Sequence, residues 1–349
     1  MTGKGRRIGI KDVAAAAGVS VTTVSHALNG KGRLPEETRE HVRQIAARLA
    51  YTPSVAARNL GGGKSGLLGL IVSQPAGSPV RFSDFAYFRD LMMAASASAM
   101  RAGYALVLAP DGSGLASQPA IPLDGAIIVD PVSGDPVVGE LLRSGVPVVT
   151  TGRLLESDGE LPWVDNDHGA GVRSVLNHLA RRGAERIALM TNPAVMSYTV
   201  DVEGAYRGWC AEQGVRPLVA RVGADLTESA GYASTRKLLS GAQRPDAIYA
   251  TYDRVGVGAL LAARATHIAV PDELLLAVTA TGSAGEPGRS SLTGLSLYPD
   301  RIGAQAAELL IELVEGREPQ SLQIQVPTRL VARTSTRRRA PRQAPLVRV

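Results

Sequence analysis

The chain has 349 residues, of which 45% are hydrophobic, so it is long enough for two or three domains with real cores. A single cysteine, Cys210, excludes an internal disulfide framework. The sequence has neither a secretion signal at its N-terminus nor a run of about 18 apolar residues, the length that spans a bilayer. We therefore expect a cytoplasmic protein.

The formal net charge of +6 is unevenly spread. Residues 1–65 hold 11 Lys or Arg and 4 Asp or Glu, and residues 333–349 hold six Arg and no acid. The residues between them hold 21 basic and 28 acidic side chains. A basic head on an acidic body predicts a polyanionic partner for the head.

Residues 8–30 predict two short helices joined by a tight turn. Residues 10–17 have helical composition, and Gly18 follows them where a left-handed residue can end a helix. Ser20 stands where an N-cap is expected, before a second helix at 21–28. Apolar residues at helical spacing should pack the two helices together, namely Val13, Ala17, Val24 and Leu28. The outward side chains suit the edges of bases in a major groove, and these are Val21, Thr22, Ser25 and His26.

A third helix is predicted within residues 33–50, with Pro35 at its start and a buried stripe made by Val42, Ile45, Ala46 and Leu49. Residues 53–60 have helix-compatible composition, but isolated helices shorter than about 12 residues are marginal in water. This segment should therefore become ordered only against a partner. Residues 61–66 are rich in glycine and indicate a flexible joint.

These motifs resemble the lactose/galactose/purine repressor (LacI/GalR) family. The resemblance rests on the run DVAAAAGVSVTTVSHALNG, on Thr38 and Arg39, and on YTPSVAARNL at 51–60, and it extends more loosely over nearly the whole chain. It implies a helix-turn-helix DNA-binding domain at 1–52 and a hinge helix with its linker at 53–66. The implied base contacts are Val21, Thr22 and His26. The implied phosphate contacts are Ser20, Thr23, Ser25, Asn29, Thr38 and Tyr51.

In the hinge segment, the resemblance places Ala57, Arg58 and Leu60 in the minor groove, with Leu60 wedged into a central base step. A wedge of this kind unstacks the step and bends the duplex. The alternative is a plain linker with a packed leucine.

The remainder of the chain alternates short apolar runs with helical patterns. Such alternation predicts parallel sheets covered by helices on both faces. The runs lie at 67–72, 105–108, 125–129, 147–149, 187–190, 246–250 and 275–278. The helical patterns lie at 88–102, 135–144, 169–182, 201–213, 229–240, 254–265 and 300–315.

The resemblance implies that residues 67–332 form an effector-binding and dimerisation body of two doubly wound lobes, similar to periplasmic sugar-binding proteins. The chain would cross between the lobes near 163–166, 291–296 and 325–328. The basic tail at 333–349 has no heptad repeat, so we expect a dimer and a disordered tail that adds nonspecific affinity for DNA.

Ligands of such sheets collect at the carboxyl ends of the strands. The resemblance and the strand ends together give the effector-binding candidates Tyr87, Phe88, Trp163, Asp165, Asp201, Tyr252 and Asp253. The aromatic residues could instead belong to the core, and Asp253 could only cap a helix. Asp201 stands where the family usually has an arginine, which disfavours an anionic effector and favours a polyhydroxylated or cationic one. The pocket could also have lost its ligand.

The motifs of an enzyme are missing. No pair among the five histidines has metal-ligand spacing, and we expect His41, His168, His178 and His267 to be structural or solvated. A nucleophile elbow and a dinucleotide fingerprint are also lacking, so we expect no catalytic residues, no metal and no cofactor.

The sequence thus indicates a ligand-responsive transcriptional repressor that binds a near-palindromic operator as a dimer. One alternative is an effector-independent architectural DNA-binding dimer with a degenerate pocket. Another is an intracellular solute binder without DNA function.

Overall fold

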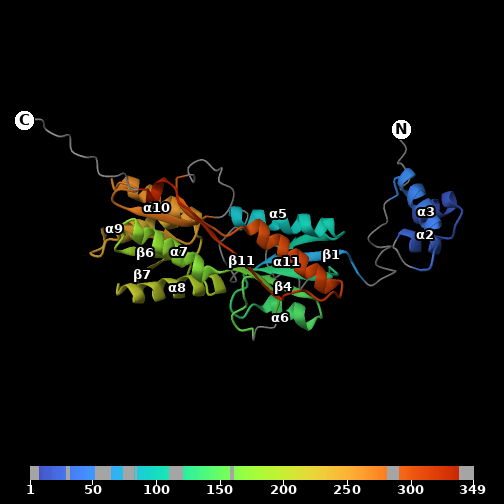
Figure 1. Ribbon diagram of the computed structural model, residues 1–349, viewed down its shortest axis with the longest axis horizontal. Coiled ribbons are helices and arrows are strands. Elements are labelled where there is room, and N and C mark those ends of the chain that lie inside the picture. The colour runs from blue at the N-terminus through green and yellow to red at the C-terminus, as the bar shows by residue number, and fades with distance from the viewer. Residues whose placement is uncertain are drawn as a thin grey trace, which may run out of the picture. The chain divides into compact units, whose positions relative to one another are not determined.

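The computed structural model in Figure 1 describes residues 8–28, 32–51, 64–73, 82, 85–109, 121–157, 161–280 and 291–337. The chain divides into two compact units, Met1–Gly66 and Leu67–Val349, and each is described by itself. The predicted hinge helix at 53–60 lies outside the described residues. In the described part of the chain, no helix has the length and apolar character needed to cross a membrane.

The first unit is a bundle of three helices, α1 (Ile10–Ala17), α2 (Val21–Leu28) and α3 (Glu36–Arg48). Gly18 ends α1 with a φ of +67°, and the Ser20 hydroxyl accepts a 3.0 Å hydrogen bond from the Thr23 amide at the start of α2. Side chains from all three helices meet in one core, where Val13, Val24 and Val42 are fully buried. Both helices of the predicted helix-turn-helix are confirmed at the expected bounds.

The first lobe of the second unit is built on a six-stranded, wholly parallel sheet. Its strands, in spatial order, are β11 (Gln323–Val326), β5 (Trp163–Asn166), β4 (Val148–Thr151), β3 (Gly125–Val129), β1 (Leu67–Val72) and β2 (Ala105–Ala109). Helices α5 (Ala86–Arg101) and α11 (Pro299–Val314) pack side by side on one face, and α6 (Pro136–Arg143) lies on the other (Figure 1). The central strands are buried because helices cover both of their faces.

The second lobe repeats this plan. Its strands, in spatial order, are β12 (Arg329–Val331), β10 (Thr293–Ser296), β9 (Leu275–Ala280), β8 (Ala247–Ala250), β6 (Ile187–Thr191) and β7 (Leu218–Arg221). Only β12 runs antiparallel, against β10, among these described strands. Helices α7 (His168–Arg181) and α8 (Ser197–Gln213) pair on one face, and α9 (Glu228–Ser240) and α10 (Asp253–Ala265) pair on the other (Figure 1). The predicted α/β class with two parallel-sheet lobes is confirmed.

Two of the three crossings between the lobes lie slightly later than expected, because the stretches predicted for them are or contain β5 and β10, and the chain changes lobe just after these strands. The third crossing follows β11 and lies within the predicted stretch 325–328. Short, partly polar strands gave too weak an apolar pattern to be recognised. The three crossings are tied together by Asn166, whose side-chain amide donates to the carbonyls of Leu297 (3.1 Å) and Val326 (2.8 Å).

The second lobe also extends past the predicted start of the tail. We expected disorder from residue 333, but Thr334–Thr336 form a 3-10 turn against β9 and β10. The Ser335 hydroxyl donates to the Leu276 carbonyl at 2.6 Å, and Thr336 bonds to both Thr293 and His178. Three buried hydroxyl contacts therefore anchor these residues. Residues 338–349 lie outside the described part of the chain.

Candidate DNA-binding and ligand-binding sites

The start of α2 presents the side chains that the sequence selects for base contact. Val21 is 41% exposed and stands outside the core of the unit, and Thr22 is also exposed. His26 lies half-buried with its ring against Gly32, and the Arg39 guanidinium donates to the His26 carbonyl at 3.2 Å. The loop before α3 therefore lies close to the imidazole, and Arg39 of α3 ties the end of α2 to the third helix.

Most of the candidate phosphate contacts lie in the described part of the first unit. Ser20 and Thr23 are joined by a 2.8 Å bond between their hydroxyls. Ser25, Thr38 and Tyr51 are half-buried, and Tyr51 packs against the core of the unit. The other proposed DNA contacts lie outside the described residues, namely Asn29, Ala57, Arg58 and Leu60.

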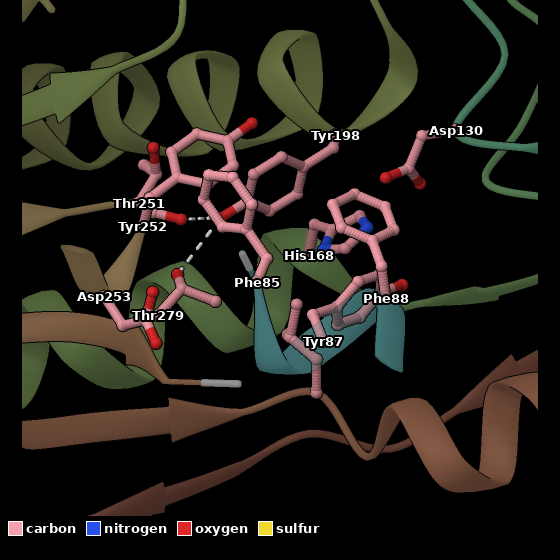
Figure 2. Close-up of a pocket in the computed structure, with 11 residues that line it drawn as sticks. Phe85, Tyr87, Phe88, Asp130, His168, Tyr198, Thr251, Tyr252, Asp253 and Thr279 are labelled. Atoms are coloured by element: carbon pink, nitrogen blue, oxygen red, sulfur yellow. Dashed lines mark hydrogen bonds between the residues drawn. The ribbon is translucent and has the colours of Figure 1, made fainter. Parts of the chain in front are cut away.

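A small cavity of about 40 Å³ lies between the two lobes of the second unit, at the carboxyl ends of several strands. Figure 2 shows a group of aromatic rings around it. The rings meet edge to face, with centroids 6.2 Å apart for Phe85 and Tyr252, which come from different lobes. The aromatic lining residues are Phe85, Tyr87, Phe88, Tyr198 and Tyr252.

The other lining residues are mostly polar: Asp130, His168, Thr251, Asp253 and Thr279, together with Leu297. The Tyr198 hydroxyl donates to the Thr251 carbonyl at 2.8 Å and lies 3.1 Å from the Thr279 hydroxyl (Figure 2). Thr251 is 2% exposed, yet its own hydroxyl has no partner among the described residues. A buried hydroxyl without a partner is a place where a ligand could supply one.

Electrostatics in the cavity centre on Asp130, Asp165 and His168. Burial, followed by repulsion from Asp165, raises the pKa of Asp130 to about 7, although His168 opposes the shift. Burial alone would lower the pKa of His168, but the Asp165 carboxylate, 2.8 Å from Nε2, attracts the proton and the net pKa is raised. The site therefore contains groups that change charge near neutral pH.

Of the effector candidates chosen from sequence, Tyr87, Phe88, Tyr252 and Asp253 line the cavity. Asp165 stands directly behind one wall, bonded to His168.

The remaining two candidates lie away from the cavity. Asp201 forms an ion pair with Arg153 of the other lobe, so the negative charge expected to shape the pocket is already matched by a guanidinium. Trp163 faces a separate pocket of about 280 Å³, which also includes Leu155 and Gln323. The described residues include no group of three or more side chains that could hold a metal ion.

The sequence analysis missed several lining residues. Asp130 and Thr251 directly follow strands, so the rule that ligands gather at strand ends could have identified them. His168, which we expected to be structural or solvated, and Tyr198 start helices just beyond a crossing or a loop. Only the folded arrangement of the lobes brings these two residues to the cavity.

Comparison with known proteins agrees with both units. Residues 9–54 match the family described as bacterial regulatory proteins, lacI family, and residues 176–336 match a periplasmic binding protein-like domain. The ribose operon repressor of Halalkalibacterium halodurans is 30% identical over 335 residues, which cover 94% of this chain and 97% of that protein. The chain belongs to the LacI family.

Other relatives are also regulators. The transcriptional regulator CelR of Thermobifida fusca is 28% identical over 95% of this chain and 98% of its own length. Its solved complex with cellobiose has a TM-score of 0.69 at 26% identity, and covers 94% of this chain and 100% of that one. The lac repressor dimer bound to operator and an anti-inducer shares the fold, with a TM-score of 0.77 at 23% identity over 95% and 99% of the two chains. As a LacI-family member, this chain is a DNA-binding transcriptional regulator.

Proposed function

We propose that this regulator is a repressor that binds a near-palindromic operator as a homodimer. Its affinity for the operator falls or rises when a small effector occupies the cavity between the lobes. The observation that carries this proposal is the helix-turn-helix of α1 and α2, with Val21 and Thr22 exposed at the start of the second helix. The relatives named as repressors support the same role.

In this proposal α2 enters the major groove. Val21 and Thr22 offer an apolar contact and a hydroxyl to base edges, and His26 can donate to a base acceptor. Ser20, Thr23, Ser25, Asn29, Thr38 and Tyr51 hold phosphates and fix the register. Ala57, Arg58 and Leu60 read the minor groove, where Leu60 opens the central step.

The first lobe offers a surface for the dimer. Met93, Ala97 and Met100 recur along one exposed face of α5, and the two methionines are 71% and 70% exposed. Leu108 is 55% exposed on β2, the edge strand next to this helix. An apolar stripe beside an open sheet edge favours association of two copies, and a two-fold dimer matches a palindromic site.

The dimer surface is tested by sedimentation of the full-length protein. Met93→Glu should convert the dimer to a monomer and weaken operator binding, because a carboxylate would be buried against its symmetry mate. Leu142→Glu is the matched control, since Leu142 is 48% exposed on α6, away from this face. A Met93→Glu protein that stays dimeric would contradict the assignment.

DNA recognition is tested by selecting bound sequences from a random DNA pool. His26→Ala should relax preference at one position of each half-site, a loss of roughly 1–3 kcal/mol against the correct base. His41→Ala is the control, because His41 is exposed on α3 and outside the proposed contacts. An unaltered selection for His26→Ala would argue against its role in reading bases.

The relatives named in the comparisons are regulators, and we propose that this chain likewise carries out no catalysis, needs no cofactor and works in the cytoplasm, where bacterial DNA lies.

One observation favours a second candidate, an architectural DNA binder without an effector: the cavity holds about 40 Å³, enough for only a few water molecules. An effector would need the lobes to open. A compound that stabilises the protein and alters operator affinity decides for the ligand-responsive regulator.

A further inference from the structure

We propose that the cavity between the lobes selects a small organic cation, an ammonium-bearing molecule held by Asp130 against the aromatic walls. The inference rests on the proposed function, because it names the chemical class of the effector at the same site. It separates this regulator from relatives whose names point to uncharged sugars, such as the cellobiose complex and the ribose operon repressor.

The first argument is charge. Among the described lining residues, the ionisable side chains other than tyrosine are Asp130, His168 and Asp253, and none is lysine or arginine. The charge that His168 can carry is matched by Asp165 behind it, at 2.8 Å. No described group donates a hydrogen bond to the Asp130 carboxylate, so a cation would give it a partner.

The second argument is the character of the walls. Cations bind to the faces of aromatic rings through the ring quadrupole, and ammonium groups are the ligands that aromatic cages recognise. Figure 2 shows Asp130 at the end of the cavity where Phe88 and His168 lie, with Asp253 and Thr279 at the other end. At the rim, Arg254 already holds its guanidinium 5.7 Å from the Phe85 ring centroid. A ligand would therefore meet rings on its sides and a carboxylate at its head.

The third argument is the balance of donors and acceptors. The Tyr198 hydroxyl is already used, since it donates to the Thr251 carbonyl. The Tyr252 hydroxyl accepts from the Asn192 amide at 3.4 Å. The Thr251 hydroxyl is buried and has no partner in the described part of the chain, so it can donate or accept a hydrogen bond, whereas the Asp130 carboxylate can only accept when ionised. The ionised carboxylate therefore needs a donor from the ligand, which an ammonium group with N–H bonds supplies, while the Thr251 and Tyr252 hydroxyls can meet a ligand hydroxyl.

Protonation of Asp130 then controls the affinity. A cation binds the ionised carboxylate, and burial raises the pKa of Asp130 to about 7, so affinity for a permanent cation should rise about tenfold from pH 6 to pH 8. His168 loses its own charge in the same direction, because its pKa is raised too. The other ionisable groups that face Asp130 are Asp165, Tyr87, Tyr198 and Tyr252.

The experiment uses pairs of probes that differ in charge with little change in shape. Isothermal titration of the full-length protein would compare choline with its uncharged isostere 3,3-dimethylbutan-1-ol, and 1-amino-1-deoxysorbitol with sorbitol. At pH 7.5 at least one charged member should bind roughly tenfold or more tightly than its partner. Asp130→Asn should remove that difference and the pH dependence. Asp272→Asn, a change of the same type in an exposed residue outside the cavity, should leave both intact.

A second variant guards against a fold defect in the first. Phe88→Leu keeps the charge and removes one ring face, so choline should bind several-fold more weakly while its pH dependence persists. Equal or tighter binding of the neutral members, or binding of none of the four probes, would overturn the cation assignment.

Operator binding is followed in parallel by fluorescence anisotropy. If a specific operator is bound and a neutral compound changes its affinity, the repressor proposal survives and the cation proposal does not. If no operator is preferred over random DNA, the proposed function itself has failed.

Discussion

Replacing Asn166 by alanine tests whether one side chain holds the three crossings together. Asn166 is 4% exposed and donates to the carbonyls of Leu297 and Val326, so the change leaves two buried acceptors without that donor. Each orphaned carbonyl costs about 1–2 kcal/mol in a buried site. The Asn166 side-chain oxygen has no partner among the described residues, and its removal returns about 1 kcal/mol. The expected net loss is therefore about 1–3 kcal/mol of unfolding free energy.

The measurement is urea unfolding followed by far-ultraviolet circular dichroism, at matched protein concentration because a dimer would make stability concentration-dependent. Asn177→Ala is the control. Asn177 is exposed and accepts one bond, from the Trp209 indole, so its loss should stay below about 1 kcal/mol. If Asn166→Ala is no less stable than Asn177→Ala, the crossings do not depend on this amide.

Two further changes test packing and charge. Gly303→Ala should destabilise the second unit by about 1–3 kcal/mol, because a Cβ there would overlap the Leu91 carbonyl where α11 crosses α5. The control is Gly208→Ala, which has open space around it and should stabilise the protein slightly. Thermal unfolding that ranks the two variants the other way would contradict the close approach of the helices. Asp130 has a pKa raised from 3.8 to about 7, so its protonated form is favoured on folding, and stability should fall as the pH rises from about 4 to about 7 and level off above that. Asp130→Asn should lessen the loss between pH 5 and pH 8 by roughly 2.5–3 kcal/mol, because about two pH units lie between pH 5 and the raised pKa and each is worth about 1.4 kcal/mol. Urea unfolding at both pH values measures this, and an unchanged difference would mean that Asp130 does not titrate in this range.

The elements that were predicted well share one property: each contains enough apolar residues in one regular pattern, either at helical spacing or as a continuous run. α2 was predicted at its observed bounds because Val24 and the residues around it repeat at helical spacing. The strand at 125–129 was recognised because it is continuous and apolar. In contrast, β11 has the sequence QIQV and β7 the sequence LVAR, and such short mixed runs become strands only because a neighbouring strand supplies their hydrogen bonds.

The cavity was predictable in part for the same reason. Tyr252 and Asp253 follow a recognised strand, so their place at its carboxyl end follows from the topology. His168 reaches the cavity through its bond with Asp165 across the first crossing, which no local pattern reports. The ion pair of Asp201 could not be foreseen, because its partner, Arg153, stands on the other lobe, far away in the sequence.

The chain has only two tryptophans, and their surroundings differ. Trp209 is 5% exposed within the second lobe, with its indole nitrogen bonded to Asn177. Trp163 begins β5, three residues before Asn166, and is half-buried beside the separate pocket of about 280 Å³. Indole fluorescence depends on exposure to water. A rotation of one lobe against the other should therefore change the emission of Trp163 and leave that of Trp209 unchanged. Trp209→Phe would thus leave a protein with a single built-in optical reporter at the joint, and its opening rate could be timed by stopped flow without attaching any dye.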